Sequence, residues 1–295
     1  MSPLTAGARR AAALLPRRGD WTGLRGSTGR NLLAGATVAL VALPLALAFG
    51  ATSGLGARAG LVTAVIAGFL AAVFGGSTLQ VSGPTGAMTV VLVPVVHQFG
   101  AEAVLMVGLM AGFILVALAV ARLGRYVRYL PMPVVEGFTA GIAVVIALQQ
   151  VPAALGVPNA EGERVWRVAF EAARTFASHP APAPLAVAVA VAAVILVGSR
   201  WRPALPFSLL AVAAATVVVQ AFSLDTDLLG TLPAALPAPS LGFFDVGALT
   251  LLLPSALAVA ALAALESLLS ATVADGMSVN QRHDPDRELF GQGIA

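Results

Sequence analysis

The chain has 295 residues, of which 58% are hydrophobic and 11% are charged, whereas about 25% of the residues in an ordinary soluble domain are charged. This composition excludes a water-soluble globular protein and indicates a protein whose apolar residues face a lipid bilayer. The sequence contains no cysteine, which excludes disulfide bonds, thiolate metal sites and a cysteine nucleophile.

Eight apolar segments, taken in chain order, predict the membrane-crossing elements of an all-α polytopic protein. A transmembrane helix needs about 20 mainly apolar residues, and all but one of these segments approach or exceed that length without interruption. The third segment is broken by polar residues, glycine and proline, and we count it as one crossing. The predicted crossings are residues 31–50, 57–74, 79–97, 103–121, 134–151, 181–198, 204–222 and 246–273.

The distribution of arginine predicts the orientation of the chain. All 17 basic residues are arginine, and with eight crossings 13 of them lie on the same side as the N-terminus and four on the other side. An excess of positive charge marks the cytoplasmic side of a membrane protein. We therefore expect a cytoplasmic N-terminus in the cell membrane (the inner or plasma membrane), and the spread of arginine over loops does not favour a nucleic-acid partner.

These crossings divide the chain into three predicted parts. Residues 1–30 form an arginine-rich cytoplasmic leader, residues 31–273 form the transmembrane domain, and residues 274–295 form a second cytoplasmic segment. One sizeable loop, residues 152–180, lies outside and carries both acidic and basic residues. We expect this loop to be an amphipathic or irregular segment.

The break in the third crossing predicts an anion site. Gly83-Pro84 is a strong turn signal and proline suits the first position of a helix, so we expect Ser82 or Gly83 to cap a helix that begins there. The free amides of its first turn and its dipole favour a negative ligand, and secondary transporters hold substrates at such breaks. A structural kink is the alternative interpretation. The candidate substrate-binding residues are Ser82, Gly83, Pro84, Thr85, Gly86 and Ala87.

Two acidic residues lie within the apolar segments. Glu136 is near the start of its segment, where a carboxylate can favour the helix N-terminus and reach the interface. Glu266 has apolar residues on both sides, and a charge at such a depth is costly enough to indicate a function. Ser270 lies one turn further along the same face, so the two oxygen-bearing side chains can hold Na⁺, or Glu266 alone can carry a proton. A carboxylate paired with arginine for structural reasons is the alternative.

Other function classes find less support in the sequence. An intramembrane hydrolase needs a nucleophile and a base at membrane depth, but His97, His179 and His283 all lie at segment ends or in loops. No nucleotide-binding loop is present, so ATP is not expected to supply energy, and no cofactor is expected. Glycines four residues apart allow helices to approach closely, either within one bundle or across a homodimer interface.

At these residues the sequence resembles the sulfate permease (SulP) family of anion transporters. The most specific match is Gln80-Val81-Ser82-Gly83-Pro84-Thr85-Gly86-Ala87, and the resemblance extends over nearly everything after about residue 25. Leu45 follows Pro44 where many members of the family have glutamine. The other matching segments are residues 35–49, 67–77, 131–138 and 266–293.

The resemblance implies a fold of two inverted seven-helix repeats, of which this chain contains the first repeat and the eighth helix, with a broken third helix preceded by a short extended segment. It also implies that Thr85 and Gly86 lie at the anion, that Glu266 is linked to coupling by Na⁺ or H⁺, and that Ser270 is a cation ligand. The expected function is secondary active transport of sulfate or bicarbonate.

The chain ends where members of this family enter their ninth helix, so a truncated product is expected, and the second broken helix is absent from it. An inactive fragment of such a transporter and a passive anion channel remain the alternatives to a coupled transporter.

Overall fold

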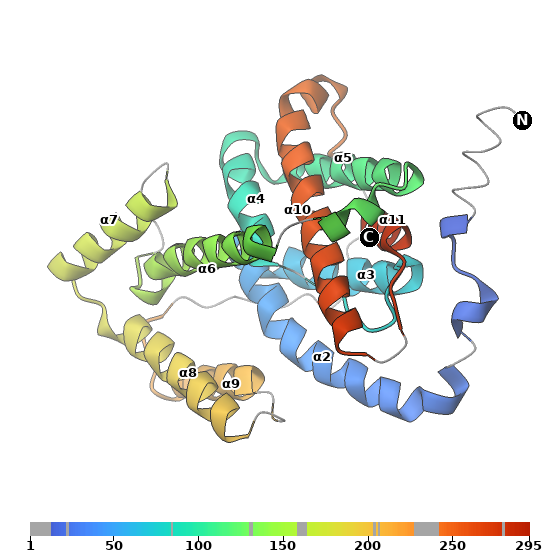
Figure 1. The fold of residues 1–295 in the computed structure, drawn as a ribbon. Coiled ribbons are helices and arrows are strands. Elements are labelled where there is room, and N and C mark those ends of the chain that lie inside the picture. Colours follow the sequence, from blue (N-terminus) through green and yellow to red (C-terminus); the bar gives the residue numbers. More distant parts are fainter. Residues whose placement is uncertain are drawn as a thin grey trace, which may run out of the picture. The chain divides into compact units, whose positions relative to one another are not determined.

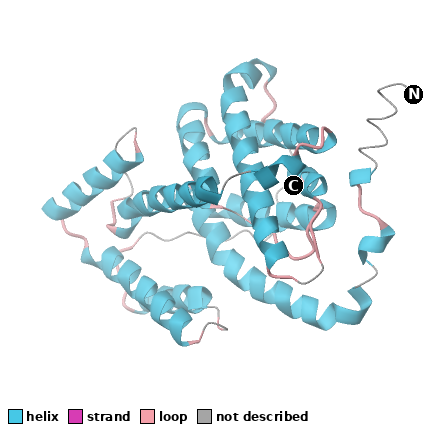
Figure 2. Ribbon diagram, viewed as in Figure 1, coloured by secondary structure: helices cyan, strands magenta, loops and turns pink. Residues whose placement is uncertain are grey.

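The computed structural model describes residues 13–21, 24–83, 85–129, 132–157, 164–202, 205, 207–226, 242–278 and 281–295. These residues are helical or lie in loops, and no strand occurs among them (Figure 2). They form two compact units, one built from residues 1–32, 46–135 and 233–295 and the other from residues 33–45 and 136–232.

Every predicted crossing contains a helix (Figure 1). Among the described residues, five helices are long and apolar enough to cross a membrane, and three shorter apolar helices lie in the remaining predicted crossings. The expected external loop contains an amphipathic helix, α7. The elements are η1 (Arg18–Trp21), α2 (Leu24–Thr52), α3 (Ala57–Phe74), α4 (Gly86–Phe99), α5 (Ala101–Val120), η2 (Gly124–Tyr129), α6 (Met132–Ala154), α7 (Val165–Ser178), α8 (Pro182–Trp201), α9 (Phe207–Ala221), η3 (Val246–Ala248), α10 (Leu249–Gly276) and α11 (Pro285–Ile294).

The third crossing is broken as predicted, but its helix begins later than expected. Helix α3 ends at Phe74, residues 75–83 are not helical, and α4 begins at Gly86. The residue that caps α4 is Thr85, in an extended conformation with φ −123° and ψ 143°. The prediction of Ser82 or Gly83 as the cap is therefore wrong, because the chain up to Ser82 is bonded to α10 and α11 instead of entering the helix. Pro84 lies outside the described residues.

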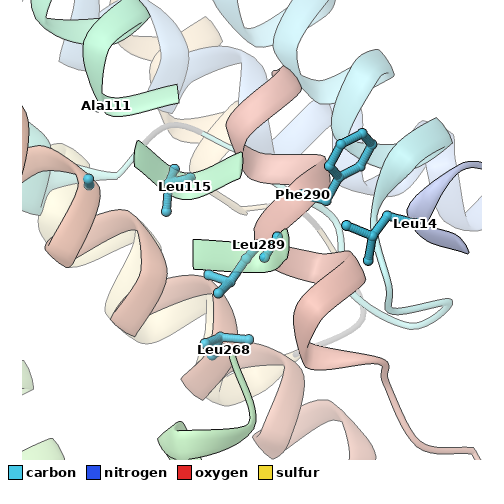
Figure 3. Close-up of a cluster of buried hydrophobic side chains, with 8 residues drawn as sticks. Leu14, Ala111, Leu115, Leu268, Leu289 and Phe290 are labelled. Carbon is cyan, nitrogen blue, oxygen red and sulfur yellow. The ribbon is translucent and has the colours of Figure 1, made fainter. Parts of the chain in front are cut away.

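The core of the first unit is a stack of α5, α10 and α11 (Figure 1). Figure 3 shows Leu115 of α5, Leu268 of α10 and Leu289 of α11 gathered in one buried cluster. Phe290 and Leu14, which precedes η1, belong to the same cluster. The buried side chains therefore bring the end of the chain against its leader and two membrane helices.

Helix α11 packs against its neighbours through glycine. A Cβ atom at Gly293 would lie 2.8 Å from the carbonyl oxygen of Gly112 on α5, and one at Gly291 would lie 2.6 Å from the Cα atom of Gly75. Real Cβ atoms do not approach backbone so closely, so only glycine permits these contacts. The glycines hold α11 directly on the backbones of α5 and of the residues after α3.

The second unit contains α6, α7, α8 and α9. Helices α8 and α9 pack on each other, and Gly198 of α8 faces the ring of Phe207, which begins α9. A Cβ atom at Gly198 would overlap that ring. The glycine thus lets the two helices approach closely.

Candidate functional site

The first unit contains a cavity of about 540 Å³, a size typical of small-molecule binding sites. Its wall is formed by the end of α2, by α3, by the start of α4, by α10 and by the last residues of the chain. Residues from the break between α3 and α4 complete it. The polar lining residues are Ser53, Thr63, Gln80, Ser82, Thr85, Thr89, Glu266, Ser267, Ser270 and Gln292.

Two of the predicted functional residues are directly bonded in this cavity. The Thr85 hydroxyl Oγ1 donates a hydrogen bond to Glu266 Oε2 at 2.9 Å. Glu266 is half-buried on α10, and Ser270, one turn further along α10, lines the same cavity. The structure thereby joins the broken helix and the carboxylate, which are 181 residues apart in sequence.

The start of α4 carries no side-chain cap. The cap residue Thr85 makes no hydrogen bond to the first turn of the helix, because its hydroxyl is directed to Glu266. The first N–H groups of a helix have no partner within the helix. The start of a helix that no side chain caps, with the positive end of its dipole, therefore adjoins the cavity, which Thr85 and Met88 line.

The other candidate residues lie around this point. Ser82 and Gly83 line the cavity. Gly86 and Ala87 are buried as the first residues of α4 and are not part of the lining. Glu136 is exposed on α6 and belongs to the second unit.

A polar network that the sequence analysis did not identify holds the break in place. Glu288 of α11 is 3% exposed, and its Oε2 accepts hydrogen bonds from the backbone N–H groups of Gly76 and Ser77 at 2.9 and 3.2 Å. Its Oε1 accepts from the Ser267 hydroxyl at 2.6 Å and from the Gln292 amide at 3.3 Å. A buried carboxylate needs such donors to offset its loss of water.

The side chains of the break are bonded to the same two helices. The Gln80 amide Nε2 lies 3.4 Å from Ser267 Oγ on α10, and the Gln292 amide of α11 donates to Ser82 Oγ. The sequence around Gln292 carries no spacing or periodicity that marks this residue as a partner of the break.

His97 and His283, the histidines of the first unit, do not line this cavity, and His179 belongs to the second unit. His97 and His179 are exposed, and His283 Nδ1 is 2.7 Å from Asp275 Oδ2 beyond the end of α10. Within the described part of the chain, no three His, Asp or Glu side chains are grouped as they would be in a metal site. The candidate site therefore consists of one carboxylate, several hydroxyl and amide groups and a helix N-terminus.

Comparison with known proteins identifies the family of the chain. The model of the sulfate permease family matches residues 29–295. YvdB of Bacillus subtilis (strain 168), which has a provisional sulfate-transporter name, is 39% identical over 272 residues, covering 90% of this chain and 51% of YvdB. The bicarbonate transporter BicA of Synechocystis sp. is 35% identical over 274 residues, covering 90% of this chain and 48% of BicA. The chain thus spans about half the length of these curated relatives.

Solved structures agree with this assignment. The transmembrane domain of a cyanobacterial bicarbonate transporter BicA superposes with a TM-score of 0.82 at 34% identity, covering 93% of this chain and 71% of that domain. SLC26A9 gives a TM-score of 0.79 at 16% identity, covering 99% of this chain and 51% of SLC26A9, and shows a shared fold. These matches confirm the predicted fold class, and the transporter names of the relatives confirm the expectation of a protein that is not an enzyme. The chain belongs to the sulfate permease family.

Proposed function

We propose that this protein carries a small inorganic anion, sulfate or bicarbonate, across the cell membrane in a step coupled to Na⁺ or H⁺. The family supports this proposal, because the names of the matched relatives refer to transport of sulfate and bicarbonate. The observation that carries the proposal is the hydrogen bond between Thr85 and Glu266, since it brings the uncapped start of α4 and an acidic side chain to one cavity.

The anion is bound, in this proposal, at the first turn of α4. Backbone N–H groups and the positive end of the helix dipole attract negative charge. Sulfate and bicarbonate both present oxygen atoms that accept hydrogen bonds from such amides. Ser82, Gly83, Pro84, Thr85, Gly86 and Ala87 are the proposed binding residues, of which Pro84 lies outside the described part of the chain.

Coupling follows from the charge of Glu266. Two negative charges about 4 Å apart repel by about 4 kcal/mol at the effective dielectric of a partly buried site. An anion at α4 and an ionised Glu266 therefore oppose each other, and a cation at Glu266 removes the repulsion. Because coupling between two sites is reciprocal, the cation strengthens anion binding and the anion strengthens cation binding.

The cation site consists of Glu266 and Ser270 in this proposal. Carboxylate and hydroxyl oxygens are suitable ligands for Na⁺, and both residues line the cavity. A proton on Glu266 would neutralise the same charge without a second ligand. We also propose that the N-terminus is cytoplasmic, as the arginine distribution indicates. A homodimer is the alternative explanation for the glycines spaced four residues apart.

The test is uptake of labelled sulfate and bicarbonate into liposomes that contain the purified full-length product of the gene, with Na⁺ or H⁺ gradients imposed separately. We expect Glu266→Gln to abolish the dependence of uptake on the coupling cation. Glu136→Gln is the matched control, because it makes the same change on an exposed residue of another helix. Unchanged dependence of the Glu266→Gln protein on both gradients would refute the coupling role.

A further inference from the structure

Glu288 lies beside the cavity without lining it. It is on α11, which packs against α3, α5 and α10 (Figure 1). Its carboxylate accepts hydrogen bonds from Gly76, Ser77, Ser267 and Gln292, with both oxygen atoms used. This group is therefore the centre of the polar contacts between α11 and the break.

The contacts of Glu288 continue to the cavity along two paths. Ser267 donates to Glu288, and its oxygen accepts the hydrogen bond from Gln80. Gln292 lies one helical turn after Glu288 and donates to both Glu288 and Ser82. Gln80, Ser82, Ser267 and Gln292 all line the cavity, so each path ends on a side chain that a bound ligand can meet.

The break has a defined register against α10, α11 and the segment between these helices. The side chains of Thr78, Gln80 and Ser82 are bonded to Gln281, Ser267 and Gln292 respectively. The intervening side chains of Leu79 and Val81 are 46% and 63% exposed. The bonded polar side chains thus alternate with exposed apolar ones, so a slip of one residue would place Leu79 or Val81 where a polar side chain is now bonded.

These contacts lie close in sequence to the start of α4. Glu288 binds the backbone at the beginning of the break, and Ser267 and Gln292 bind side chains further along it. Only a few residues then separate Ser82 from Thr85, whose hydroxyl meets Glu266. A shift at Gly76 would therefore move Thr85 and the first amides of α4 relative to Glu266.

We propose that Glu288 is a positioning residue for the anion site: it sets the register of the break, and so holds the start of α4 against Glu266, without contacting the anion. The proposal rests on the proposed anion-binding function. A carboxylate is required because both of its oxygen atoms accept. Glutamine at this position would replace one of the two carboxylate oxygen atoms by an NH₂ group, and the donors that bond that oxygen would then have no acceptor.

The first experiment compares Glu288→Gln with Glu102→Gln, which makes the same change on an exposed residue of α5, in the full-length protein in liposomes. We expect Glu288→Gln to raise the KM for the anion about tenfold, with the maximal rate within about twofold of the original. Glu102→Gln should match the original protein. An unchanged KM, or a lower melting temperature with unchanged KM, would overturn the proposal.

Two milder variants keep the test decisive if Glu288→Gln does not fold. Ser267→Ala and Gln292→Leu each remove one path, and each should raise KM by a smaller factor than Glu288→Gln. In folded protein, the double variant with Gln292→Leu and Glu288→Gln should raise KM by less than the product of the two single factors. The reason is that both residues act through one network. Full additivity, or no effect of either mild variant, would contradict the proposal.

A labelling experiment separates this proposal from the proposed function. Because the chain has no native cysteine, the single variants Val81→Cys and Ser82→Cys report the register by the rates at which they react with a small thiol reagent. We expect position 81 to react much faster than position 82, and Glu288→Gln to reduce that difference severalfold. If the original protein neither binds nor moves an anion but the labelling behaves as expected, the proposed function fails and the positioning role stands. If anion uptake occurs and Glu288→Gln leaves the labelling unchanged, the positioning role fails.

Discussion

Thr85 and Glu266 are joined by a 2.9 Å hydrogen bond between a hydroxyl and a carboxylate. Thr85 immediately precedes the broken helix α4, and Glu266 is the acidic residue deep within α10. A threonine in this position usually caps its own helix, whereas here the hydroxyl serves the carboxylate. The anion half and the cation half of the proposed site therefore share one contact.

Replacing Thr85 by valine should weaken the coupling between anion and cation. Thr85→Val keeps the shape of the side chain and removes the hydroxyl that bonds Glu266. A hydrogen bond to a charged group contributes about 1.5–3 kcal/mol, so the concentration of coupling cation for half-maximal uptake should change about tenfold or more. Thr85→Ser keeps the hydroxyl and is the control. Equal cation dependence in the two variants would show that the bond has no role in coupling.

Adding a side chain at the start of α4 should weaken anion binding. Gly86 is buried as the first residue of the helix, and valine there would crowd the approach to the first amides. We expect Gly86→Val to lower anion affinity about tenfold or more, a change of about 1.4 kcal/mol, measured by calorimetry on purified protein. Gly108→Val is the control, because a Cβ atom at Gly108 meets nothing within 4 Å. If the Gly86→Val protein bound the anion with the same affinity as the original protein, this result would count against the site.

Alanine at two glycines of the bundle should change stability in opposite directions. A Cβ atom at Gly293 would lie 2.8 Å from the Gly112 carbonyl oxygen, whereas one at Gly108 meets nothing within 4 Å. Gly293→Ala should cost about 1–3 kcal/mol through overpacking. Gly108→Ala should stabilise α5 by up to about 1 kcal/mol through helix propensity. Thermal unfolding in detergent measures both, and a shift of the same sign in both variants would be inconsistent with the packing of α11 on α5.

The leader should be attached to α11 more weakly in acid. The Arg287 guanidinium, 2.6 Å from Asp20, lowers the pKa of that carboxyl, and the backbone N–H of Arg17 contributes further. A group whose pKa is lowered by folding stabilises the folded state above its unfolded pKa of about 3.9, and this contribution is lost as the pH falls through the folded value.

Because this ion pair is partly exposed, Asp20→Asn should cost less than about 1 kcal/mol at pH 6, and the difference should vanish near pH 2. Leu14→Ala removes a buried contact of the same leader and should lower stability at both pH values. Melting temperatures at the two pH values measure these effects. If Asp20→Asn lowered the melting temperature equally at both pH values, the ion pair would be excluded as the cause of the loss of stability.

The features that were predictable from the sequence are those that depend on neighbours along the chain. Hydropathy located the membrane helices, Gly83-Pro84 located the break, and the apolar neighbours of Glu266 marked it as a candidate functional residue, which the structure places in the cavity. Each of these signals is local, because the cost of a polar group in lipid applies residue by residue.

The start of α4 and the role of Glu288 were not predictable in this way. The break is held by contacts between residues more than 180 positions apart, and these overcome the local tendency of the Gly83-Pro84 pair to begin a helix. Glu288 lies in a polar segment that is typical of a cytoplasmic loop. Its burial depends on backbone N–H groups of Gly76 and Ser77, and no sequence pattern shows which distant amides will meet a carboxylate.

Selenate, a heavier analogue of sulfate, offers the most direct test of the anion site. Its anomalous scattering can be located in crystals of the full-length protein grown with selenate and Na⁺. The expected result is a peak within hydrogen-bonding distance of the backbone N–H groups of Gly86 and Ala87, on the cavity side of Thr85. A selenate peak elsewhere in the protein with none at α4, or a helix that continues without a break from residue 79 to residue 97, would contradict the proposed mechanism.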